Sequence, residues 1–326
     1  MHIQLILEHD FHLLLTSFFN TATYNVQIFK ELYILKKYFV LLFILSLFGY
    51  ILFFPTLALE ASKAGLLLWF DTLLPTLLPF LILSQLLLKT SANQLFRKIS
   101  APLFMKIFHC SAEGSFCALC GFLCGYPVGA RLLALQVKNN QISLEEGQYL
   151  LSFCNNVSPM FCISYGILNG IGSKLIWPYL CIIYGSSLCF GLLTRPEMKS
   201  STYYDTKKQT PPAENIFQLI DVCIIDSFLI MIKLCGYMIL FSVLSKAFTL
   251  PVSENIYIQS TILSILEITG GLHAVANLPS GIIQQGIAIF SLTFGGLCCL
   301  FQTNSVICNS KLSLKTYFFS KCKITG

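Results

Sequence analysis

The hydrophobic positions of this chain fall into long runs, most of them close to the length that a helix needs to cross a lipid bilayer. An α-helix rises about 1.5 Å per residue, so roughly 20 apolar residues span the hydrocarbon core. Polar and basic residues are concentrated between the runs, which is typical of a polytopic membrane protein. The runs that we interpret as helical segments occupy residues 38–59, 64–88, 115–137, 144–168, 175–193, 216–249, 255–276 and 281–306.

Two of these runs are irregular. Pro75 and Pro79 lie one helical turn apart in the second run, and each lacks the amide hydrogen that an interior helical residue donates. We therefore expect a kinked or discontinuous helix over 64–88. The run 216–249 would be about 51 Å long as one helix, which exceeds the membrane core, so we expect its first third at the interface.

The run over residues 115–137 contains a Gly-Tyr-Pro-Val-Gly sequence in its middle. Gly121, Gly125 and Gly129 recur every four residues, and this spacing lets helix backbones approach closely. Proline and glycine in the middle of a run favour a turn, and basic residues flank this run on both sides. We expect a re-entrant helical hairpin that enters and leaves the membrane on the cytoplasmic side.

The chain divides into two similar halves around a polar segment. Each half combines spanning runs, a glycine-rich interruption and polar residues, which is typical of transporters with an internal repeat. The predicted fold is an all-α, polytopic integral membrane helical bundle with re-entrant hairpins and discontinuous helices. The predicted domains are an N-terminal extension (1–36), a first membrane half (37–194), a cytoplasmic linker (195–214), a second membrane half (215–310) and a basic cytoplasmic tail (311–326).

The composition agrees with this interpretation. Hydrophobic residues make up 55% of the chain, charged residues 11%, and the mean hydropathy is +0.73. Soluble domains carry about 25% charged residues, so an ordinary soluble enzyme and a disordered chain are excluded. The net charge of +6 comes from basic residues in short loops, which indicates cytoplasmic flanks and not a nucleic-acid-binding surface. We expect a cell-membrane location with both termini in the cytoplasm, and the lipid bilayer as partner.

The 14 cysteines lie mostly within apolar runs. A disulfide framework belongs to short secreted chains, and zinc or iron–sulfur sites usually take four ligands. Cys117, Cys120 and Cys124 lie on an apolar, glycine-rich segment without a fourth ligand at a useful spacing. We interpret the cysteines as small hydrophobic residues and expect no metal, no cofactor and no enzymatic activity. A membrane thiol enzyme is the weakest alternative.

A pair of asparagines precedes a proline in the run 144–168. Asn155, Asn156 and Ser158 would leave unpaired polar groups in hydrocarbon, at a cost of several kcal/mol, unless they find partners. Asparagine amides both donate and accept hydrogen bonds, so they suit a neutral polar ligand. The alternative is that they join neighbouring helices by hydrogen bonds, and the sequence leaves both open.

The turn in the hairpin run is a candidate gate. A Gly-Pro-Gly turn exposes backbone groups at membrane depth, where only a cavity or neighbouring protein satisfies them. Gly125, Tyr126, Pro127 and Gly129 form this turn. Arg131 follows it, and either senses an anionic group or extends its side chain to the cytoplasmic interface.

A lone carboxylate lies in the middle of the run 255–276. Such a group is costly in lipid and marks a solute or ion pathway, or pairs with a cation. Glu267 could bind a proton, a sodium ion or a ligand hydroxyl; Lys233 is the alternative, structural partner. Thr269 follows, and we expect the glycines at 270–271 to break the helix.

The last run repeats the features of the first half. Gly295 and Gly296 predict a second break, and Gln302 follows as a candidate binding residue. As a counterpart to the first gate, the glycine pair is predicted to form a second gate, with the polar residues of both halves lining a site near the membrane midplane.

Five stretches of the chain carry a resemblance to a known family. They lie at residues 69–87, 121–134, 145–161, 265–272 and 294–302, and include GYPVGA, SFCNN and ILEITGGL. In this order they resemble the YlbJ-type sporulation integral membrane proteins, which carry the nucleoside recognition or Gate domain and are related to concentrative nucleoside transporters. The resemblance covers roughly residues 37–326, and the last stretch departs from the family pattern at 299–301.

The resemblance implies a multi-pass membrane protein of endospore-forming Gram-positive bacteria that is needed for spore formation, and it implies no particular substrate. Our leading hypothesis is a gate or permease-like protein for a small polar solute, nucleoside-like by resemblance only. A coupling ion and further copies of the chain are the other partners considered. The alternative is a structural or assembly factor of the developing spore membrane without transport activity.

Overall fold

The structure is a computed structural model that describes residues 37–38, 40–90, 101–102, 104–196, 216–252 and 254–326. The chain divides into two compact units, Met1–Thr56 and Leu57–Gly326. The described part of the first unit contains the apolar helix Val40–Phe53. The predicted extension 1–36 and nearly all of the predicted linker 195–214 lie outside the described residues. The sites discussed below lie in the second unit.

The described residues form helices and no strand, which confirms the predicted all-α class. Within them, three helical segments are apolar enough, and long enough at about 1.5 Å per residue, to cross a membrane. These segments are Pro55–Lys89, Ile216–Val252 and Ile282–Ile307.

The first long segment keeps its helical course through both prolines. It comprises α2 (Pro55–Leu68), the π-helical turn η1 (Trp69–Leu73) and α3 (Leu74–Lys89). The predicted irregularity takes the form of this π-helical turn directly before Pro75, and a wider turn relieves the clash between a proline ring and the preceding carbonyls. The indole Nε1 of Trp69 donates a hydrogen bond of 2.9 Å to the Met231 carbonyl, which ties the turn to the next long helix.

That next helix, α10 (Ile216–Thr249), runs without a break for 34 residues and continues into η3 (Leu250–Val252). Large apolar side chains are exposed along it at helical spacing, as contact with lipid chains requires. Examples are Val222, Ile225, Leu229 and Ile232.

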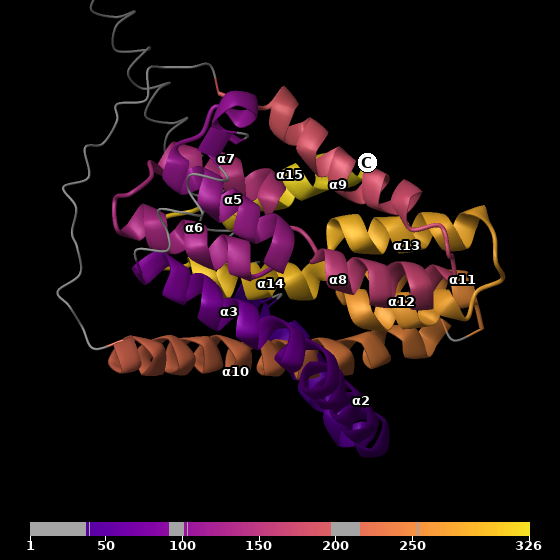
Figure 1. The fold of residues 1–326 in the computed structure, drawn as a ribbon. Helices are drawn as coiled ribbons and strands as arrows, with labels where there is room; N and C mark the ends of the chain where they lie inside the picture. The colour runs from indigo at the N-terminus through magenta and orange to yellow at the C-terminus, as the bar shows by residue number, and fades with distance from the viewer. Residues whose placement is uncertain (1–36, 39, 91–100, 103, 197–215, 253) are drawn as a thin grey trace, which may run out of the picture. The chain divides into compact units, whose positions relative to one another are not determined.

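A helical hairpin followed by a broken helix occurs twice in the chain (Figure 1). The first copy contains α5 (Ala112–Cys124) and α6 (Val128–Lys138), then α7 (Leu144–Cys154), α8 (Pro159–Phe161) and the π-helical η2 (Cys162–Ile171). The second contains α11 (Ile256–Leu266) and α12 (Ile268–Ala276), then α13 (Ile282–Phe294) and α14 (Gly296–Ile307). In each copy the first two helices pack against each other. The predicted hairpins and discontinuous helices are therefore present, and the same order of elements recurs in the second half, as the predicted internal repeat requires.

The turn of each hairpin has a local cause. Gly125 ends α5 with a φ of 77°, a conformation that favours glycine, and the Tyr126–Pro127 peptide is cis. In the second hairpin the break lies at Glu267, which has extended backbone. Our expectation that the glycines at 270–271 would break this helix is wrong, because both lie within α12 and Glu267 caps the helix before them.

The C-terminal segment, predicted as a basic cytoplasmic tail (311–326), is helical over most of its length. It forms α15 (Leu314–Thr325), which packs against α7, α13, α14 and α9 (Trp177–Leu193). Tyr317 and Lys321 are buried, whereas Lys315 and Lys323 are exposed. The basic composition of this segment does not reveal its amphipathic spacing, in which residues four apart share one helix face.

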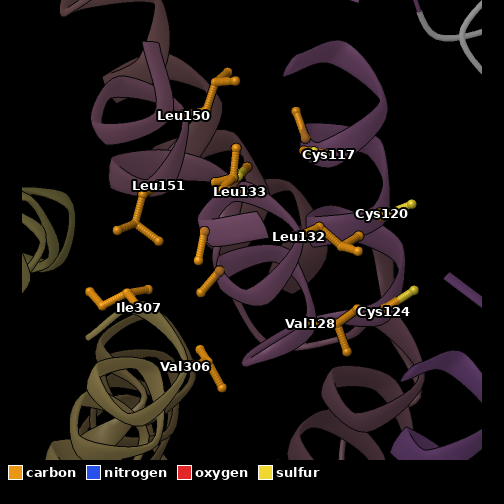
Figure 2. Close-up of a cluster of buried hydrophobic side chains, with 14 of the residues drawn as sticks. Cys117, Cys120, Cys124, Val128, Leu132, Leu133, Leu150, Leu151, Val306 and Ile307 are labelled. Carbon is orange, nitrogen blue, oxygen red and sulfur yellow. The ribbon is translucent and has the colours of Figure 1, made fainter. Parts of the chain in front are cut away.

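A core of apolar side chains joins the first hairpin to α7 and α14. Figure 2 shows this cluster, in which leucines of α6 and α7 meet Val306 and Ile307 of α14. Cys117, Cys120 and Cys124 belong to the same cluster as free, buried thiols. Their packing is that of small hydrophobic residues.

Candidate functional site

The four interruptions of the repeated helices lie against one another in two pairs. The amide of Tyr126, in the first hairpin turn, donates a hydrogen bond of 2.8 Å to the carbonyl of Asn156, between α7 and α8. A Cβ at Gly125 would lie only 2.5 Å from the Ser158 nitrogen. Each hairpin tip thus packs on a broken helix, because a Cβ at Gly296 would likewise lie 3.2 Å from the Glu267 backbone.

The two pairs also meet each other. A Cβ at Gly295 would lie 3.0 Å from the hydroxyl oxygen of Tyr126, so the first hairpin tip reaches the break of the second discontinuous helix. Gly295 and Gly296 both have positive φ values, of 83° and 76°, which glycine adopts without strain. The glycines at the predicted gates therefore allow both the positive φ values and the close contact between the backbones.

A cavity of about 480 Å³, counted with its open mouth, lies at this meeting point. Its wall includes both hairpin tips, the residues after both helix breaks, and side chains of α3 and α10. The lining residues are Leu73, Thr76, Leu77, Cys124, Tyr126, Val157, Ser158, Phe161, Met238, Glu267, Ile268, Thr269, Cys299 and Gln302. The centre of a water-sized sphere can occupy only about 40 Å³ of it, so the cavity is narrow in this conformation.

Glu267 contributes the charge of this cavity. Its side chain is buried, and its two carboxylate oxygens accept hydrogen bonds from the amides of Thr269 (2.8 Å) and Gly270 (2.6 Å). The carboxylate thus caps α12, where the positive end of the helix dipole favours a negative charge. The alternative partner, Lys233, is an exposed residue of α10, and the structure gives no support for that pair.

Three more of the predicted binding residues line the cavity. Ser158 caps α8 by accepting a hydrogen bond of 3.3 Å from the Phe161 amide. Thr269 and Gln302 are buried, and among the described residues the Gln302 amide nitrogen donates to a thiol alone, that of Cys298 at 3.2 Å. The Ser158 hydroxyl and the Gln302 amide can therefore exchange hydrogen bonds with a bound solute.

Asn155 is buried but lies outside the cavity lining. Its amide nitrogen donates to the hydroxyls of Thr303 (3.1 Å) and Tyr317 (2.9 Å). The Tyr317 hydroxyl in turn donates to the Asn155 carbonyl at 3.1 Å. These contacts match the alternative that we left open, in which the asparagine joins helices.

Asn156 has the same kind of surroundings. Its amide nitrogen donates to the Phe153 carbonyl at 2.7 Å, and its oxygen accepts hydrogen bonds from Ser187 (3.1 Å) and Lys321 (2.7 Å). The structure therefore brings the backbone of Asn156 to the hairpin tip and ties its side chain to α9 and α15.

Three residues of the predicted first gate, Pro127, Gly129 and Arg131, lie outside the cavity lining. Pro127 precedes α6, and Gly129 packs directly against Gly121 across the hairpin. Arg131 is half-buried on α6, outside the cavity lining, and its Nε is buried without a hydrogen-bond partner among the described residues.

Sequence reasoning missed two groups of residues. The first group lines the cavity but was not among the predicted site residues, and consists of Leu73, Thr76, Leu77, Cys124, Val157, Phe161, Met238, Ile268 and Cys299. The second is the pair Tyr317 and Lys321, which reach the first helix break from α15. Only the second group had a sequence signal, the four-residue spacing of two large side chains within the tail.

Three comparisons with known proteins bear on identity. No family model matches this sequence. No solved structure matches it. A curated relative, "Sporulation integral membrane protein YlbJ" of Bacillus subtilis (strain 168), is 25% identical over 86% of this chain and 78% of its own. The chain is therefore similar to YlbJ along most of its length, and the three long apolar helices within the described residues agree with an integral membrane protein.

Proposed function

We propose that this protein acts in sporulation as a gated, permease-like membrane protein for a small polar solute. The observation that carries the proposal is the meeting of both hairpin tips and both helix breaks around one cavity. Irregular backbone at membrane depth is tolerated where it is buried in protein or lines a water-filled cavity. Transporters with internal repeats place their substrate sites between broken helices in this manner.

The chemistry of the wall favours a solute with several hydrogen-bonding groups. Glu267 supplies a carboxylate, Gln302 an amide, and Ser158, Thr269 and Tyr126 supply hydroxyls. Apolar side chains form the rest of the lining, as in most small-molecule sites. A nucleoside-like solute is the class that the family resemblance suggests, and a coupling ion belongs to the same proposal.

The hairpin tips are the proposed gates. A Cβ at Gly125 would clash with the neighbouring broken helix, and one at Gly296 would lie unusually close to the second tip, so the tips close the site by backbone contact. Passage of a solute requires one tip to move away from its broken helix. The mechanism needs no chemical step on the solute, and the proposal therefore assigns no enzymatic activity.

Uptake into vesicles tests this function. The purified protein is reconstituted and assayed with a panel of radiolabelled nucleosides and other small polar solutes, and the variants Gln302→Leu and Gln284→Leu are compared. Both glutamines are 4% exposed, but only Gln302 lines the cavity, whereas Gln284 donates to the Val275 carbonyl. We expect Gln302→Leu to lower uptake at least tenfold, as losing a hydrogen bond in a buried site does, and Gln284→Leu to change it little.

Spore formation in a strain that lacks its own relative gives the second readout. We expect the wild type and Gln284→Leu to restore spores, and Gln302→Leu to fail at normal membrane levels. Normal sporulation by Gln302→Leu and Glu267→Gln, together with no uptake by the wild type, would favour a structural or assembly role in the spore membrane.

A further inference from the structure

Lys321 is a buried cation that is held by neutral hydrogen-bond acceptors. Its side chain is 1% exposed, and its ammonium donates to the Asn156 side-chain oxygen at 2.7 Å and to the Thr293 carbonyl at 3.3 Å. The Tyr317 ring lies beneath it, with the ammonium 5.9 Å from the ring centroid. The part of the chain that the structure describes places no carboxylate within ion-pair distance of this ammonium. Burial of a charge is costly unless fixed dipoles replace its water shell.

The dipoles at this position come from both broken helices. Asn156 lies just beyond the C-terminal end of α7, and Thr293 lies in the last turn of α13. The C-terminal end of a helix carries partial negative charge and unpaired carbonyl groups. One ammonium therefore faces the negative ends of two half-helices, one from each copy of the repeat.

A further buried acceptor lies on the residue directly before Asn156. The side-chain oxygen of Asn155 is buried and has no hydrogen-bond donor among the described residues. Side-chain and backbone oxygens at the ends of broken helices are the groups that bind small cations in membrane transporters. The local chemistry is that of a cation site, yet the cation here is covalently attached to α15.

We propose that the Lys321 ammonium is a built-in cation, which occupies an oxygen-lined monovalent-cation position between α7 and α13. It offsets the negative ends of both half-helices and links the two copies of the repeat. Removal of the side chain leaves a vacant position that a free small cation fills. This inference concerns the ends of the broken helices and does not depend on whether the protein transports a solute.

The test compares Lys321→Ala with the wild type and with Lys323→Ala, an exposed lysine of the same helix. The thermal unfolding midpoint of each purified protein is measured in chloride salts of choline, sodium, potassium and methylammonium at equal ionic strength. Choline is too bulky for the vacated space and serves as the inert cation.

We expect the wild type and Lys323→Ala to unfold at the same temperature in all four salts. Lys321→Ala should unfold at a lower temperature in choline. Its midpoint should rise saturably with sodium, potassium or methylammonium, by on the order of 5 °C. A midpoint of Lys321→Ala that is independent of the cation would overturn the proposal.

If Lys321→Ala does not fold, a second pair of variants tests whether the Lys321 ammonium acts as a built-in cation. Lys321→Met fills a similar volume without charge, and Lys321→Arg keeps the charge. A built-in cation predicts that the arginine variant keeps a higher unfolding midpoint than the methionine variant. A methionine variant as stable as the wild type would show that the side chain only fills space, and the proposal would be wrong.

Discussion

Gly129 and Gly121 are in direct backbone contact across the first hairpin: a Cβ at Gly129 would lie 2.6 Å from the Cα of Gly121. A Cβ at Gly121 would in turn lie 2.6 Å from the carbonyl oxygen of Cys154. The glycine row therefore holds α5 against α6 on one side and against α7 on the other. This contact places the hairpin tip at the break of the first discontinuous helix.

Alanine at position 129 should therefore destabilise the protein. We expect Gly129→Ala to lower the free energy of unfolding by about 1–3 kcal/mol, since the backbones must separate to admit the methyl group. Gly185→Ala on α9 is the matched control, because nothing lies within 4 Å of a Cβ there. Alanine favours a helix over glycine, so the control should be unchanged or slightly more stable. Equal losses in thermal unfolding for the two variants would contradict the close-contact explanation.

The second hairpin should respond in the same way. A Cβ at Gly271 would lie 2.5 Å from the Cα of Ser264 on the opposite arm. We expect Gly271→Ala to cost about 1–3 kcal/mol of unfolding free energy, and Gly286→Ala on α13, with nothing within 4 Å, to cost none. Thermal unfolding of both variants in detergent tests this. A neutral Gly271→Ala would mean that the two hairpins are not equivalent.

Glycine spacing made the first hairpin predictable from the sequence, and the second less so. Gly121, Gly125 and Gly129 indicated both the close approach and the turn, and the structure shows both. In the second hairpin the turn residue is a carboxylate, Glu267, which replaces a glycine turn by capping the next helix. Sequence reasoning placed that break at the nearest glycines because an extended glutamate has no comparable signature.

Replacement of Glu267 by glutamine separates its two roles. In Glu267→Gln only one side-chain oxygen remains to accept from the amides of Thr269 and Gly270, so the cap weakens. We expect a loss of about 1–2 kcal/mol in unfolding free energy, as for other cap and hydrogen-bond deletions. Solute uptake should fall much further than this loss of stability explains, because the charge of the cavity is gone.

Glu254→Gln is the control for this substitution, because Glu254 is exposed and lies outside the cavity lining. Its unfolding midpoint and solute uptake should match the wild type. If the Glu267→Gln variant still takes up solute, the carboxylate is not part of the proposed binding site.

The Tyr317 hydroxyl should contribute measurably to stability. It exchanges hydrogen bonds with the side chain and the carbonyl of Asn155, and Tyr317→Phe leaves both of these buried groups short of a partner. We expect a loss of about 1–3 kcal/mol, the cost of unsatisfied buried polar groups. Tyr257→Phe on α11 should have no effect, since its ring is exposed. If the two variants unfold alike, α15 does not hold the helix break in the way that the contacts indicate.

The role of α15 was the least predictable part of the site. The candidate asparagines were recognised because amides are rare in apolar runs, but their partners come from Tyr317 and Lys321, more than 150 positions further along the chain. Apolar runs and glycine spacing are local signals. Contacts between distant segments depend on packing, which hydropathy does not encode, and the charge of the segment indicated only a cytoplasmic tail.

The cysteines of the first hairpin should prove dispensable for function. Cys117, Cys120 and Cys124 are buried free thiols in the apolar cluster of Figure 2. The triple alanine variant should lose about 1 kcal/mol of unfolding free energy per site, as other small core deletions do, while solute uptake and spore formation persist. Cys308→Ala, at an exposed thiol, controls for cysteine loss as such. Because Cys124 also lines the cavity, a complete loss of uptake at normal stability in the triple variant, but not when Cys124 alone is replaced, would indicate thiol chemistry at the other two positions.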